Sequence, residues 1–159
     1  MPKLKLGCKL LLLFLMGGAA YFGLETLWRG FSHPSMFVLG GVCFVLVGFI
    51  NEFLPWYMEL ELQALLGAAI ITAAEFATGL TVNVWLGLNV WDYSALPLNF
   101  MGQISLQYFL LWIPLSAVAI ILDDYIRYRL FGEKRPRYCL LSSKIGQILA
   151  KSLDKKHRS

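Results

Sequence analysis

The sequence predicts an all-α, polytopic membrane protein with four transmembrane helices and both termini in the cytoplasm. Of its 159 residues, 58% are hydrophobic and only 15% are charged, and the apolar residues form blocks long enough to cross a hydrocarbon core of about 30 Å. The basic residues gather at the two ends of the chain. Because basic flanks stay on the cytoplasmic side of a membrane, we expect an even number of crossings.

The charge distribution also predicts the domains and the partners of the chain. Three lysines precede residue 10 and ten Lys or Arg residues follow residue 126, whereas the sequence between them has one basic residue and eight acids. We therefore expect a transmembrane domain over residues 1–128 and a basic cytoplasmic tail over residues 129–159. Such a tail typically meets anionic lipid, and the absence of a recognition motif speaks against nucleic acid. The spacing of the three cysteines predicts neither a zinc site nor a disulfide.

The first predicted span covers residues 10–28. Its charged start and small residues resemble a signal peptide, but the apolar run continues to Trp28-Arg29, which favours an uncleaved helix with an interfacial anchor. Glu25 precedes Arg29 by four residues, the favourable order for a helical ion pair. The pair either neutralises Glu25 locally or belongs to a helix face that looks into a polar cavity.

The second and third predicted spans cover residues 36–54 and 62–84. Gly40, Gly41 and Gly48 allow another helix to approach the second span closely, and residues 55–57 are typical of an interfacial belt. Glu75 interrupts the third span. A carboxylate at that depth costs roughly 2.5–3.5 kcal/mol if nothing compensates it, so Glu75 must have a partner. That partner is either a structural hydrogen bond, for example to Thr72, or part of a site.

The last part of the chain contains an outer loop, a fourth span and the tail. Residues 91–102 are rich in turn formers and interfacial aromatics, which predicts an ordered loop. The fourth span covers residues 103–125, and Pro114 predicts a kink in it. Apolar residues at helical spacing in the tail, with lysines between them, predict an amphipathic basic helix on the inner leaflet.

The polar residues of the outer half predict one binding site. We expect acids and amides from several spans to converge there, and a set without histidine suits a hard cation or a polar organic group better than zinc. No metal or cofactor is expected, and the sequence lacks a phosphate-binding loop, a GxSxG turn and an HExxH helix. The candidate ligand-binding residues are Glu25, Arg29, Glu75, Trp91, Asp92, Asn99 and Gln103.

Three stretches of the sequence resemble a known family. Glu25, the run EFATG at residues 75–79 and above all the run WDYSALPLNFMG at residues 91–102 are similar to small bacterial membrane proteins catalogued as putative ABC-transporter type IV, or ABC transporter permeases. The resemblance covers residues 18–125. It implies transport across the bacterial inner membrane. Four helices are few for a permease, which implies a homo-oligomer or a separate ATPase subunit.

The resemblance favours a permease-like protein that binds or moves a small ligand or ion, and two other functions stay open. One is a membrane enzyme that acts on a lipid-borne substrate with Glu75 and Asp92 as general acid and base. The other is a scaffold that works through its basic tail. The absence of a nucleophile motif favours a protein that is not an enzyme.

Overall fold

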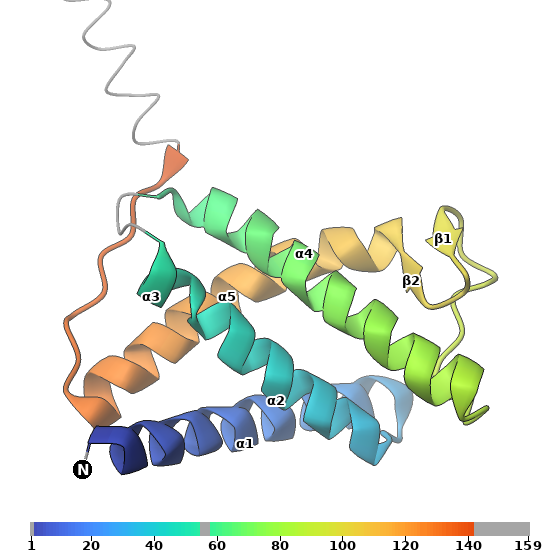
Figure 1. The fold of residues 1–159 in the computed structure, drawn as a ribbon. Helices are drawn as coiled ribbons and strands as arrows, with labels where there is room; N and C mark the ends of the chain where they lie inside the picture. Colours follow the sequence, from blue (N-terminus) through green and yellow to red (C-terminus); the bar gives the residue numbers. More distant parts are fainter. Residues whose placement is uncertain (1, 55–57, 142–159) are drawn as a thin grey trace, which may run out of the picture.

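The computed structural model describes residues 2–54 and 58–141, and in this part of the chain four helical segments are long and apolar enough to cross a membrane (Figure 1). These segments confirm the four predicted spans in number and order, and the protein is a multi-pass membrane protein. Their bounds are Leu6–Arg29, Pro34–Phe53, Leu60–Trp85 and Leu106–Phe131.

The first two spans form a close helical pair. Helix α1 (Pro2–Arg29) lies along α2 (Pro34–Gly48), whose N-terminus is capped because the His33 side chain accepts a hydrogen bond from the Ser35 N–H. A Cβ atom on Gly40 would lie 2.4 Å from the Cβ atom of Tyr21. The predicted use of small residues for close helix approach is therefore confirmed at Gly40. A single short turn, α3 (Ile50–Phe53), completes the second span.

The third span differs from the continuous helix that the sequence predicts. It consists of α4 (Leu60–Gly79) and a terminal π-helical segment, η1 (Leu80–Trp85). The Leu86 N–H bonds to the carbonyl of Thr81 at 2.9 Å, five residues earlier. The chain then leaves the helix at Gly87, which has a φ of +65° that favours glycine.

The predicted outer loop contains a small antiparallel hairpin of β1 (Asn99–Phe100) and β2 (Ile104–Ser105). The prediction that Gln103 belongs to the fourth span is wrong, because α5 (Leu106–Phe131) begins three residues later. Ser105 is extended and its hydroxyl accepts the Tyr108 N–H, so it caps the helix. Helix α5 continues through Pro114 and ends where Gly132 adopts a left-handed conformation.

The four spans place the start of α1 and the end of α5 together, as Figure 1 shows. We call this end of the bundle, which contains Lys9 and Arg127, the inner end, and the end with the hairpin the outer end. Lys9 forms an ion pair with Glu133 just after α5. The following segment returns along the inner end to the start of α4, where the Leu60 N–H bonds to the Cys139 carbonyl at 2.9 Å.

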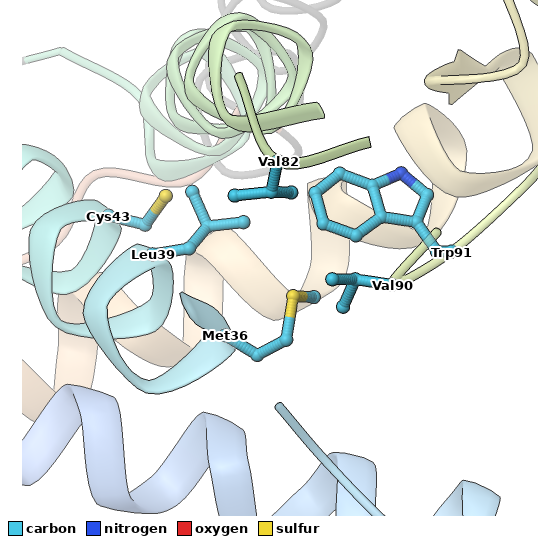
Figure 2. Packing of buried hydrophobic residues seen from close by; sticks show 6 residues of the cluster. All are labelled: Met36, Leu39, Cys43, Val82, Val90 and Trp91. Carbon is cyan, nitrogen blue, oxygen red and sulfur yellow. The ribbon is translucent and has the colours of Figure 1, made fainter. Parts of the chain in front are cut away.

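Three apolar clusters fill the bundle. Figure 2 shows the outer cluster, in which residues of α2 meet η1 and the chain that follows it. Its buried members are Met36, Leu39, Cys43, Val82, Val90 and Trp91. Towards the inner end, Leu13, Phe44 and Ile126 join α1, α2 and α5, and a third cluster of Val47, Ile50 and Ile120 lies beside them.

Some predictions stay predictions. The interfacial belt at residues 55–57 and the amphipathic helix of the tail, over residues 142–159, lie outside the described residues. The expected domain boundary at residue 128 falls inside α5, which continues to Phe131. The cytoplasmic location of the inner end also rests on the charge distribution alone.

Candidate functional site

Glu75 has two partners that the sequence did not identify. Its side chain lies on α4 and the residue is 1% exposed. The Tyr93 hydroxyl donates to one carboxylate oxygen at 2.9 Å, and the Trp112 indole N–H donates to the other at 3.1 Å. The prediction that Glu75 must have a partner is thus confirmed, although Thr72 is not that partner: its hydroxyl has none among the described residues.

The two donors reach Glu75 from different elements. Trp112 lies on the face of α5 that packs against α4, and Tyr93 belongs to the outer loop. The Tyr93 ring stacks on Tyr108 at a centroid distance of 4.4 Å, which fixes its direction. Burial raises the pKa of Tyr93, and the adjacent Glu75 carboxylate raises it further, so the phenol stays protonated and remains a donor.

A cavity of about 160 Å³ borders Glu75. All four spans contribute to its wall, and Glu75 is the one carboxylate among the lining residues. Besides Glu75, the lining residues with polar groups are Tyr21, Cys43 and Trp112, and the others are apolar. The lining residues are Gly17, Ala20, Tyr21, Leu24, Leu39, Gly40, Cys43, Phe44, Val47, Ile71, Glu75, Trp112, Leu115, Val118, Ala119 and Leu122.

A second hydrogen-bonded group joins η1 to the outer loop. The Asn83 amide donates to the Gln103 side-chain oxygen at 2.8 Å, and the Trp91 indole N–H donates to the Gln103 carbonyl at 2.9 Å. A Cβ atom on Gly79 would lie 2.5 Å from that side-chain oxygen, so Gly79 leaves the space that Gln103 occupies. Trp91 and Gln103 are both buried and hold this loop on the bundle.

The predicted ion pair of the first span is confirmed. Arg29 Nη1 lies 2.6 Å from Glu25 Oε1, and Ser32 donates to the other oxygen of Glu25. Arg29 also donates to the carbonyl of Val90 at 3.0 Å. The pair therefore ties the outer end of α1 to the chain that leads into the outer loop.

Asp92 and Asn99 organise the outer loop itself. Asp92 accepts the Ser94 N–H at 2.8 Å and the Ser94 hydroxyl at 2.9 Å, an Asx turn that lowers the pKa of Asp92. Asn99 donates to the Leu96 carbonyl at 2.7 Å and accepts the Gly102 N–H at 3.1 Å. Asp92 is exposed and committed to this turn, so the geometry does not favour an acid and base pair of Glu75 and Asp92.

The seven predicted site residues thus fall into separate groups, and of these residues Glu75 alone lines the cavity. Asn83 and Trp112 are not among the residues that the sequence predicts for the site. A signal for Trp112 exists, because tryptophan prefers the membrane interface and Trp112 stands well inside a predicted span. Within residues 2–54 and 58–141, no three His, Cys, Asp or Glu side chains gather as a metal site would require.

Comparison with known proteins identifies the family. The model of the family described as putative ABC-transporter type IV matches residues 19–147, which is most of the chain. No curated protein and no solved structure is similar to the chain at a significant level. The matched region includes Glu25, Glu75 and the entire outer loop, the three stretches on which the resemblance rested. The chain belongs to the putative ABC-transporter type IV family.

Proposed function

We propose that the protein is a permease-like membrane subunit that binds or moves a small ligand through a pocket centred on Glu75. The observation that carries the proposal is a carboxylate, 1% exposed, that borders a cavity and is held by two neutral donors. The family to which the chain belongs supports a role in transport.

The contacts of Glu75 leave room for a ligand. Each carboxylate oxygen can accept more than one hydrogen bond, and each has one described donor. In the described part of the chain, no Lys or Arg forms an ion pair with Glu75. A donor group or a cation that enters the cavity can therefore add the interaction that the protein itself does not supply.

The other predicted site residues act in this proposal as positioning residues. Trp91 and Gln103 hold the outer loop, and that loop holds Tyr93 against Glu75. Arg29, oriented by Glu25, supports the same loop through Val90. Asp92 and Asn99 shape the turns that present Tyr93, so these six residues set the geometry of the pocket without lining it.

Transport by this chain also requires an assembly. The four spans line a cavity of about 160 Å³, and the sequence has no phosphate-binding loop of its own. The proposal therefore includes a second copy of the chain or a separate ATPase subunit. It places the protein in the bacterial cytoplasmic membrane, with the basic tail against anionic lipid.

Native mass spectrometry of the full chain, released from nanodiscs, tests the pocket. We expect the wild type to retain a small molecule and Glu75→Gln to lose it, at an unchanged subunit count. Glu61→Gln is the matched control, because Glu61 lies at the inner end of α4 and accepts the Leu141 N–H, a role that an amide oxygen can keep. Equal retention by all three proteins would contradict the proposal.

A further inference from the structure

The cavity beside Glu75 separates α1 from α5. Helix α1 packs mainly on α2, and α5 packs mainly on α4. Near the inner end, Leu13 of α1 and Ile126 of α5 belong to one cluster with Phe44. Further out, the cavity lies between the two helices, and the wall residues there include Leu24, which is 59% exposed, and Val118, which is 60% exposed. The cavity is therefore open to the side.

This opening faces the hydrocarbon core. Val118 lies near the middle of the span Leu106–Phe131, so about 18 Å of helix separates it from either end. Leu24 belongs to the span Leu6–Arg29. A molecule that enters beside Val118 would therefore come from the lipid and not from water.

The cavity has a polar end and an apolar end. Along α5 its wall runs from Trp112 to Leu122, a rise of about 15 Å. Glu75 and Trp112 mark the outer part, where the Tyr21 ring lies 5.9 Å from that of Trp112. Val47 and Leu122 mark the inner part, which carries no polar side chain.

We propose that the ligand is an amphiphile with a hydrocarbon chain, taken from the bilayer through the opening between α1 and α5. Its chain lies along the apolar part of the cavity, and its hydrogen-bonding head lies beside Tyr21 and Glu75. This inference rests on the proposed function, because it names the ligand class of the same pocket.

The size and lining of the cavity support this occupant. Its volume of about 160 Å³ resembles that of an apolar cavity that stays dry and binds benzene. It accommodates several carbon atoms of a chain, and the rest of the chain leaves through the side opening. An ion is a poor occupant of such a cavity, because apolar side chains cannot replace its hydration shell.

Photolabelling of the full chain in liposomes tests the route. The probe is a monoacylglycerol with a diazirine near the middle of its chain, and mass spectrometry locates the label. We expect label on Val47, which is 1% exposed and lines the cavity. Excess unlabelled monoacylglycerol should reduce this label several-fold. The label on Leu111, which is 48% exposed and not in the cavity wall, should change little, because it reports bulk lipid.

A variant that fills the cavity gives the second test. Ala119→Phe should lower the Val47 label several-fold, since Ala119 lines the cavity. Ala73→Phe is the matched control, because Ala73 is exposed on α4 and is not part of the wall. If Ala119→Phe does not fold, the competition experiment on the wild type still decides the question.

The results distinguish the inference from the proposed function. An unlabelled Val47 beside a strongly labelled Leu111 would overturn the inference. If Glu75→Gln then loses a water-soluble molecule that the wild type retains, the proposed binding pocket at Glu75 is supported and an amphiphilic ligand is excluded. A third result is a Val47 label that unlabelled monoacylglycerol reduces equally in the wild type and in Glu75→Gln, with no retained molecule lost. This result would support a lipid-binding cavity and contradict a binding role for Glu75.

Discussion

The two ends of the bundle both bury carboxylates, but the partners of these carboxylates are charged at the inner end and neutral at the outer end. At the inner end, Asp123 is 0% exposed and Arg127 is 3% exposed, and Arg127 Nε lies 2.5 Å from Asp123 Oδ2. The same Arg127 reaches Glu52 at 2.9 Å. At the outer end, Glu75 is equally buried but meets Tyr93 and Trp112, which are neutral.

The inner end also joins elements far apart in the sequence. Asp124 accepts the Asn51 amide at 2.6 Å and the Tyr138 hydroxyl at 2.8 Å. Burial raises the pKa of Tyr138, and its hydrogen bond to the carboxylate raises it further, so the phenol remains a donor. These contacts link α3, α5 and the segment that follows α5, so they have a structural role. We call the contacts of Asp123, Asp124 and Arg127 the inner clamp.

The comparison supports a structural role for the inner carboxylates and the proposed binding role for Glu75. A buried ion pair costs most when one partner is removed, because the other charge is left unpaired. Glu75 has no such partner in the described part of the chain and borders a cavity. We therefore expect the inner end to tolerate substitution poorly and the outer carboxylate to be replaceable without loss of the fold.

The largest expected effect is at the inner ion pair. Arg127→Met should lower the free energy of unfolding by about 3–5 kcal/mol, because it leaves Asp123 charged and buried. The measurement is a reversible denaturation titration in mixed micelles. Arg129→Met, an exposed position on the same helix, should change the free energy by less than about 0.5 kcal/mol. Similar free energies of unfolding for the two variants would contradict the stabilising role of Arg127 in the inner clamp.

A smaller effect is expected at the donors of Glu75. Trp112→Phe keeps an aromatic ring beside Tyr21 and removes one hydrogen bond to the carboxylate, which should cost about 1.5–3 kcal/mol in the same titration. Trp85→Phe serves as control, since Trp85 is 83% exposed. No difference between the two would mean that the indole N–H does not hold Glu75.

The smallest effect is expected in the outer loop. Asp92→Asn keeps the side-chain oxygen that accepts the Ser94 N–H, and Asp92 is exposed, so the unfolding free energy should stay close to that of the wild type. Ligand retention in native mass spectrometry should also persist. If the variant folds normally but loses the ligand, Asp92 contributes to ligand binding and not only to the loop.

The sequence predicted the spans well because the apolar blocks encode them directly. Local spacing also predicted the ion pair of Glu25 and Arg29, and the turn formers of residues 91–102 predicted an ordered loop. The sequence did not predict the π-helical end of the third span. An apolar pattern does not show whether backbone hydrogen bonds join residues five apart, as in a π-helix, or four apart, as in an α-helix. The start of α5 was placed too early, although Ser105 before an apolar run is a helix-start signal.

The site was predicted less well because its contacts are long-range. Glu75 stood out as the one ionisable residue deep in a span, but its partners lie 18 and 37 residues away in sequence. Helical periodicity relates residues three or four apart and says nothing of such pairs. For the same reason the acids and amides of the outer half, which were expected to converge on one site, form several separate hydrogen-bonded groups.

The most direct test compares Glu75→Gln with Asp123→Asn in one denaturation titration. An amide at position 75 can accept from Trp112 and donate to the Tyr93 hydroxyl, so we expect a change below about 1 kcal/mol. Asp123→Asn leaves Arg127 with Glu52 as its one charged partner among the described residues and should cost about 1.5–3 kcal/mol. Equal losses in the two variants would show that Glu75 holds the fold together, and would contradict its role as a binding residue.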